Sequence, residues 1–250
     1  MSVEVRRDAE ALFYLLESTL ADVAISLTMF ETTRAGFRRD LESGPEHEER
    51  QRSAEQSVRA RYDNALRLEA DPDIRWSIAM ATNDQLRAEV QLARWEAGEV
   101  PQSYQLRIVF LYAKAFTFAL DTIGKGLRAL ARLEGAPEAA RQASTAFDAA
   151  FPQLVHVRDS AHHAEDRVRG KDRKGQRINL QPIVNEAINA PQGGVLVIDQ
   201  LMNDRYGGTL GDGSYGEVEV SLKSAAVVQQ AVQAAVDAWT WKGSPRMTPS

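Results

Sequence analysis

Three of the chain's four histidines lie between His156 and His163, and Arg158 lies among them. Imidazole is the side chain whose charge can change near neutral pH, and guanidinium is a fixed, forked cation that fits phosphate oxygens. Placed about one helical turn apart, the two groups suit phosphodiester chemistry. No other segment of the sequence combines a proton-transfer side chain with an anion-binding one at such short spacing, so the functional interpretation depends on this segment.

Helical geometry separates the members of this segment. At ~100° per residue, His162 lies ~40° from Arg158 and His163 lies ~140° from it. Arg158 also lies one turn beyond the core-facing Leu154, where an uncompensated charge is costly. It must therefore find an acidic partner, reach solvent or line a cleft. In the structural alternative, Arg158 pairs with Glu165 or Asp166 and the histidines are surface residues.

A metal site is a further alternative for the same segment. His162 with Asp166, or His156 with Ser160 and His163, has part of the spacing that a metal ion needs. The sequence contains no HExxH motif and no cysteine. We therefore expect no metal and no cofactor.

The run Arg158-Asp159-Ser160-Ala161-His162-His163 resembles the signature of the HEPN superfamily, an arginine and a histidine separated by four to six residues. In that family the signature lies on the last long helix of a four-helix bundle. Here it follows three helical segments and a Gly-Ala-Pro turn, and the resemblance covers about residues 74–170.

The resemblance implies metal-independent RNA cleavage, in which the ribose 2′-hydroxyl attacks the adjacent phosphorus. Arg158 would hold the scissile phosphate and His163 would act as general acid or base. Helical geometry instead favours His162 for the acid–base role, so both histidines are candidates. Asp159 would orient the imidazole of His163. The resemblance further implies a homodimer and a ribonuclease of toxin–antitoxin or defence systems, with RNA as substrate and an antitoxin or a nucleotidyltransferase as partner.

A basic segment follows the motif directly. It could contact RNA phosphates without reading sequence, and the candidate side chains are Arg167, Arg169, Lys171, Arg173 and Lys174. No aromatic residue is interleaved for base stacking. The alternative is a solvated helix end and loop.

A second function from another class fits the same residues. The chain could be a non-catalytic, dimeric interaction protein that kept the HEPN-like fold, with Arg158 as a buried bridge to an acidic partner. A nucleotide bound in the groove of the bundle is a further alternative.

Composition sets wider limits. The 250 residues are 44% hydrophobic and 26% charged, with 7% aromatics, which is typical of a globular protein rich in helix. A net charge of −5 argues against a protein that coats nucleic acid over its whole surface. The N-terminus does not resemble a signal peptide, and the apolar stretch 108–123 is too short to span a bilayer. We expect a cytoplasmic protein that does not engage a membrane.

Apolar residues at three- and four-residue steps predict helices over about 5–39, 74–97, 102–133 and 138–169. The charged segment 46–68 is expected to be an exposed helix or arm. Two long helices joined by a short turn are expected to pack antiparallel.

The C-terminal part has a different pattern. Runs at 195–198 and 217–221 predict two strands, with turn material at 207–214 between them and a helix over about 225–239, which Trp239 and Trp241 would anchor against the bundle. The predicted fold is mainly α: an antiparallel helical bundle of four or more helices with a small C-terminal β-hairpin and a closing helix. We expect one domain over 1–242, with the bundle in 1–170, the hairpin and final helix in 171–242, and a disordered tail in 243–250.

Overall fold

A computed structural model describes residues 3–42, 71–96 and 102–240, with a few single positions between them. Trp241, the tail 243–250 and nearly all of the arm expected at 46–68 lie outside the described residues. The chain divides into two compact units, one made of residues 1–30 and 110–250 and the other of residues 31–109. Each unit is described by itself below.

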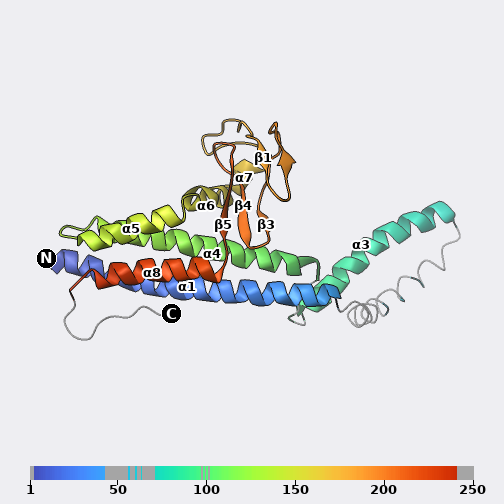
Figure 1. The fold of residues 1–250 in the computed structure, drawn as a ribbon. Coiled ribbons are helices and arrows are strands. Elements are labelled where there is room, and N and C mark those ends of the chain that lie inside the picture. The colour runs from blue at the N-terminus through green and yellow to red at the C-terminus, as the bar shows by residue number, and fades with distance from the viewer. Residues whose placement is uncertain are drawn as a thin grey trace. The chain divides into compact units, whose positions relative to one another are not determined.

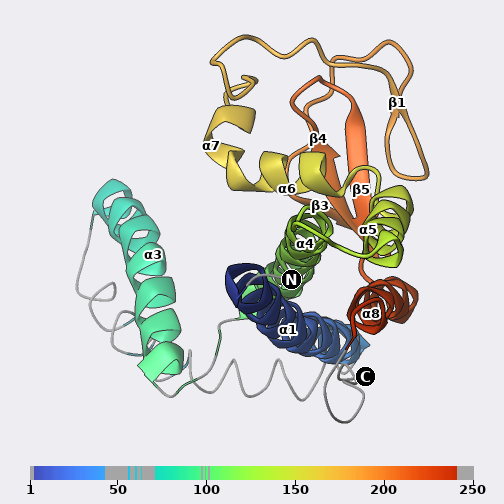
Figure 2. The ribbon, with the colours of Figure 1, turned by 90° about the vertical axis from the view of Figure 1, so that its left-hand side faces the viewer.

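The first unit is built on a helical bundle. The parts of α1 (Val3–Glu42) and α4 (Gln102–Ala131) that belong to it lie alongside α5 (Glu138–Ala150) and α8 (Leu222–Asp237), as Figures 1 and 2 show. Apolar side chains at helical spacing fill the space between the helices; the large ones include Phe13, Leu16, Phe30, Phe116, Leu120, Ile123, Leu127, Leu130 and Phe147. The prediction of a mainly helical fold with a small antiparallel sheet and a C-terminal helix is confirmed.

Two glycines let the neighbours of α4 approach closely. A Cβ atom at Gly124 would lie 2.7 Å from Phe147 of α5, and one at Gly126 would lie 2.8 Å from Leu16 of α1. At the other end of the sequence, the ring of Trp239 meets Phe13 of α1 edge-on with a centroid distance of 6.0 Å. Trp239 therefore anchors the end of α8 against the bundle, as we expected.

The single helix predicted over 138–169 is wrong, because the chain breaks twice. The first break lies at Phe151-Pro152, after α5 and before α6 (Leu154–His162). Proline has no N–H to continue the helix and disfavours helical backbone in the residue before it. Phe151 accordingly leaves the helical region (φ −126°, ψ 61°) and packs its ring 5.0 Å from that of Phe147.

The second break lies at His163. This residue ends α6 and precedes α7 (Ala164–Arg167), with φ −104° and ψ 43°. The histidine motif therefore lies on a nine-residue helix that ends inside the motif, and not on a long rod of the bundle.

The strands follow α7. β3 (Gln200–Met202), β4 (Arg205–Thr209) and β5 (Tyr215–Glu219) form an antiparallel sheet in that order. β1 (Ile183–Val184) pairs with β2 (Asn189–Ala190) in a separate ladder. α6 packs against β4 and β5, so the sheet is held over the segment that carries the histidines (Figure 2).

The strand expected at 195–198 is wrong, although Val197 forms two hydrogen bonds with Thr209 of β4. The backbone N–H of Thr209 donates to the carbonyl of Val197 at 2.8 Å. The backbone N–H of Val197 donates to the hydroxyl of Thr209 at 2.9 Å. Gly207 and Gly208, expected in a turn, lie inside β4. Their lack of a side chain serves close backbone approach instead, because a Cβ at Gly207 would lie 2.7 Å from the Cα of Glu217 on β5.

The second unit contains α3 (Pro72–Glu96) and the adjoining ends of α1 and α4. In it the rings of Trp95 and Tyr104 meet edge-on at 5.8 Å. Over Val3–Gly36, α1 is long and apolar enough to cross a membrane by length and composition alone, a feature that the sequence reading did not single out. Core helices of soluble proteins have the same property, and Phe13, Leu16 and Leu20 of this helix are buried in the bundle.

Gly207→Ala is predicted to destabilise the protein by about 1–3 kcal/mol, because the added methyl group meets the backbone of β5 and cannot be accommodated without moving a strand. Urea denaturation measures this change. Gly36→Ala is the matched control, since a Cβ there meets no atom within 4 Å and replaces glycine inside α1, where alanine is the better helix former. Equal stability of the two variants would contradict the prediction.

Candidate functional site

One stripe of α4 organises the surroundings of the histidine motif. Lys114, Phe118, Asp121 and Lys125 fall within ~60° of one another around the helix, and we call them the α4 stripe. Phe118 contacts His162, with ring centroids 6.3 Å apart. Further contacts of the stripe reach Arg158 on α6 and Asp199, which precedes β3.

Arg158 is held by two carboxylates. Its Nε lies 2.9 Å from Oδ2 of Asp121, without hydrogen-bond alignment, and its Nη2 donates a long hydrogen bond of 3.4 Å to Oδ1. Its Nη1 lies 2.6 Å from the carboxylate of Asp159. The Asp121 side chain is only 3% exposed and also pairs with Lys125 Nζ at 2.7 Å. Two cations thus face two carboxylates, and Arg158 retains 17% of its side-chain exposure.

These contacts differ from the pairs considered for Arg158. Asp166 pairs with Arg169 at 2.6 Å, and Glu165 lies beside His163, so neither serves Arg158. The structure also places the Asp159 carboxylate on Arg158, whereas Nδ1 of His163 faces Glu165 at 3.7 Å. Asp159 therefore orients the guanidinium group, not the imidazole we expected it to orient.

The two histidines lie side by side at the end of α6. Their rings meet edge-on with centroids 5.1 Å apart. His162 is exposed and turns towards α4, where it contacts Phe118, on the same side as Arg158. The helical rotation that separates His163 from Arg158 is thus reflected in their contacts: Arg158 and His162 share the α4 stripe, and His163 faces α7.

An open groove lies beside Phe118 of the α4 stripe. It has a volume of about 380 Å³ and runs between α1 and α4. Its lining residues are Thr19, Asp22, Ile25, Ser26, Tyr112, Ala115, Phe118, Ala119 and Thr122. Phe118 belongs both to this groove and to the contact with His162, whereas His162 and Arg158 are not among the residues that line the groove.

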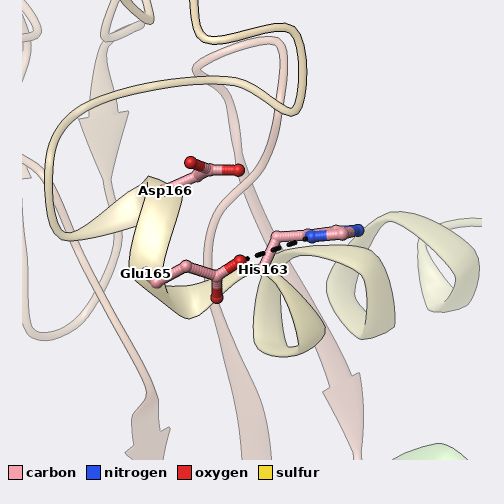
Figure 3. Close-up of side chains that lie close together, drawn as sticks. All are labelled: His163, Glu165 and Asp166. Atoms are coloured by element: carbon pink, nitrogen blue, oxygen red, sulfur yellow. Dashed lines mark ion pairs between the residues drawn. The ribbon is translucent and has the colours of Figure 1, made fainter.

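His163, Glu165 and Asp166 are the described residues whose positions could hold a metal ion. One ligand atom from each lies within 4.8 Å of the others. Figure 3 shows the three side chains around the break between α6 and α7, with the ion pair of His163 and Glu165 dashed. The sets considered from the sequence, His162 with Asp166 and His156 with Ser160 and His163, are not the ones brought together here.

The structure corrects the expectation that Arg167 contacts RNA. Its side chain is 4% exposed, because Nη1 donates to the carbonyl of Lys171 at 2.7 Å and Nε donates to the hydroxyl of Ser160 at 3.2 Å. Ser160 in turn donates to the carbonyl of Thr209 on β4 at 3.0 Å. Arg167 therefore ties α7 and the following loop to α6 and the sheet.

The other basic candidates lie around one turn. Arg173 and Lys174 are exposed, Lys171 is half-buried, and Arg169 is bound to Asp166. The carboxylate of Asp172 accepts the backbone N–H groups of Gln176 and Lys174, and the first of these bonds is the main cause of its lowered pKa. The turn thus presents Arg173 and Lys174 to solvent in an ordered loop.

Sequence reasoning missed three members of the cluster: Phe118, Asp121 and Lys125. A signal for one of them is visible in the sequence, since Lys114 and Asp121 interrupt the most apolar stretch of the chain. A carboxylate in such a stretch needs a cation nearby. Spacing along the chain does not show that this cation is Arg158, 37 residues later.

Arg158→Ala is predicted to lower the free energy of unfolding by about 3 kcal/mol, because it leaves the buried Asp121 carboxylate with only Lys125. Asp121→Asn combined with Arg158→Ala should cost less than the sum of the single changes, by about 1–3 kcal/mol. Lys125→Ala is the control, because it removes the partner of Asp121 whose side chain is largely exposed, and it should cost no more than about 1 kcal/mol. Strictly additive losses in urea denaturation would show that Asp121 and Arg158 are not coupled.

Comparison of the chain with protein families, with curated proteins and with solved structures finds no match. The resemblance to the HEPN signature therefore depends on the residues of the motif and on their place after the bundle helices. A functional conclusion has to be argued from the geometry of the α4 stripe and the residues that contact it.

Proposed function

We propose that this chain is a HEPN-like, metal-independent endoribonuclease of the kind that acts in toxin–antitoxin or defence systems. The observation that supports this best is that Arg158 and the exposed His162 both turn towards the α4 stripe, beside an open groove. A guanidinium group and an imidazole presented on one side of a helix are the pair that cleavage of a phosphodiester needs.

In the proposed reaction the ribose 2′-oxygen forms a bond to the adjacent phosphorus and the bond from phosphorus to the 5′-oxygen breaks. The proton of the 2′-hydroxyl passes to an imidazole base, and the leaving 5′-oxygen takes up a proton. The products are a 2′,3′-cyclic phosphate and a 5′-hydroxyl. His162 is our first candidate for the proton transfers because it is exposed and shares the side of Arg158, and His163 is the second.

The cations of the cluster would stabilise the charge that grows on the phosphorane oxygens. Lys125 is suited to meet the phosphate, because its side chain is 57% exposed. Asp121 and Asp159 hold the guanidinium group of Arg158 in place from two sides. Phe118, between the groove and His162, offers a ring on which a base could stack.

A second candidate function has its own supporting observation. The buried Asp121 binds Arg158, as in the alternative of a non-catalytic interaction protein in which this arginine is a bridge inside the fold. A neutral cluster of two cations and two carboxylates attracts phosphate less than an unpaired arginine would. The two candidates differ in one measurable property, the cleavage of RNA.

We further propose a cytoplasmic homodimer that engages an antitoxin or a nucleotidyltransferase. Two copies would bring two arginine–histidine pairs together, as the HEPN resemblance implies for Arg158 and His163. Light scattering after gel filtration measures the number of subunits independently of activity.

The wild-type protein is predicted to cleave RNA in the presence of EDTA and to leave 2′,3′-cyclic phosphate ends. His162→Ala should lower the rate by about 10²–10⁴-fold, the usual contribution of one general acid or base. Phosphate-end mapping of a labelled RNA measures both effects. His156→Ala is the matched control, since His156 is an exposed histidine on the same helix and should keep full activity.

Three outcomes would count against the nuclease: no cleavage by the wild type, cleavage that requires added metal, or cleavage that survives replacement of both His162 and His163. The first, in a folded protein, would favour the non-catalytic interaction protein.

Arg173→Ala with Lys174→Ala is predicted to weaken RNA binding and to reduce its dependence on salt, because each exposed cation that contacts a phosphate releases a counterion. Fluorescence anisotropy at several salt concentrations measures this. Arg167→Ala should instead destabilise the fold, since it removes the buried links to Ser160 and Lys171. An unchanged salt dependence in the double variant would contradict the assignment.

A further inference from the structure

We propose that His163, Glu165 and Asp166 bind one divalent transition-metal ion of the zinc class at the break between α6 and α7. The three residues each offer a ligand atom, and these atoms lie within 4.8 Å of one another. His163 stands at the backbone break, and both carboxylates lie in the first turn of α7, from which Glu165 reaches towards the imidazole (Figure 3).

The distances are close to those that an ion requires. Zinc–ligand bonds to imidazole nitrogen and carboxylate oxygen are about 2.0–2.2 Å long, so two ligand atoms on one ion lie at most about 4.4 Å apart. Nδ1 of His163 is already 3.7 Å from Oε1 of Glu165. The Glu165 side chain is 67% exposed, so its carboxylate can move towards an ion more freely than a packed side chain could.

The chemistry of the three side chains selects the class of metal. An imidazole nitrogen with carboxylate oxygens suits zinc and similar transition metals, whereas magnesium and calcium take sites made of oxygen alone. In the described part of the chain one guanidinium group, that of Arg169, is paired with these two carboxylates, through Asp166, so their summed charge is negative and favours a divalent cation.

Arg169 has a supporting position in this site. Its Nη2 lies 2.6 Å from Oδ1 of Asp166, and its Nε donates to the carbonyl of Glu165 at 2.9 Å. The first contact orients the carboxylate and leaves Oδ2 for a metal ion, in the way that neighbours of a metal ligand commonly fix its geometry. The second holds the turn that brings Glu165 and Asp166 together.

The site does not depend on the proposed nuclease activity. The nuclease requires no metal, and its first candidate for proton transfer is His162, which contacts Phe118 of α4 and is not one of the three proposed ligands. Metal binding and RNA cleavage can therefore be measured separately, and either can fail without the other.

Isothermal titration of the full chain with ZnCl₂ tests the proposal. The wild type is expected to bind one zinc ion, and His163→Ala and Asp166→Asn should each weaken binding by at least about tenfold, the loss seen when even a supporting neighbour of a ligand is removed. His156→Ala and His162→Ala are the controls and should bind like the wild type. Circular dichroism of each metal-free variant establishes that it is folded.

Two results would overturn the proposal. One is the absence of saturable binding by the folded wild type. The other is binding that His162→Ala removes and Asp166→Asn leaves unchanged, because zinc would then be held by the adjacent histidine pair alone. Substitution with Co²⁺ gives a second readout, since its visible absorption reports nitrogen and oxygen ligands directly and should be lost in His163→Ala.

Discussion

A buried carboxylate on α4 constrains the geometry of the whole histidine segment. Asp121 is 3% exposed, and an isolated charge at such a place costs several kcal/mol. Arg158 and Lys125 neutralise it from two sides. Because Arg158 comes from α6, this helix cannot rotate about its own axis without separating the charges. The contact of His162 with Phe118, one turn later on α6 and about one turn earlier on α4, is fixed by the same constraint.

A second polar contact holds the sheet in a similar way. Asp199 binds Lys114 of the α4 stripe at 3.1 Å and accepts a hydrogen bond of 2.5 Å from the hydroxyl of the buried Tyr206 on β4. Asp199 adopts a left-handed backbone conformation (φ 53°) that is uncommon for residues other than glycine. The two side-chain contacts offset the cost of that conformation. Charges at two levels of one helix thus position α6 and the sheet together.

The sequence predicts the parts of this arrangement that depend on periodicity. The rods of α1, α3 and α4 and the final helix follow from the spacing of their apolar residues, within a few residues at each end. The long helix at 138–169 could not be divided correctly by periodicity, because its apolar pattern continues across Phe151-Pro152. Pro152 was the visible sign that the helix ends there, and its effect on the backbone was stronger than the apolar pattern.

The partners in the site are harder to foresee than the elements. The pairing of Arg158 with Asp121, and of Arg167 with Ser160 and Lys171, depends on how helices approach one another in space. Charge and spacing show that an arginine near the core needs a partner, but several carboxylates nearby in the sequence satisfy that requirement equally well. The glycines of β4 were wrongly predicted to form a turn for a related reason. Gly207 is needed because the backbone of β5 lies close to it, and a contact with another strand cannot be read from the local sequence.

The break at Phe151-Pro152 separates a helix that packs in the bundle from a helix that carries the ionisable side chains. α5 is committed to the bundle, where Ala140, Ala143 and Phe147 are buried. α6 begins after the proline, in a new direction, and carries the ionisable side chains. The break therefore lets α6 take the orientation that brings Arg158 to Asp121 of α4, while α5 keeps its apolar contacts in the bundle.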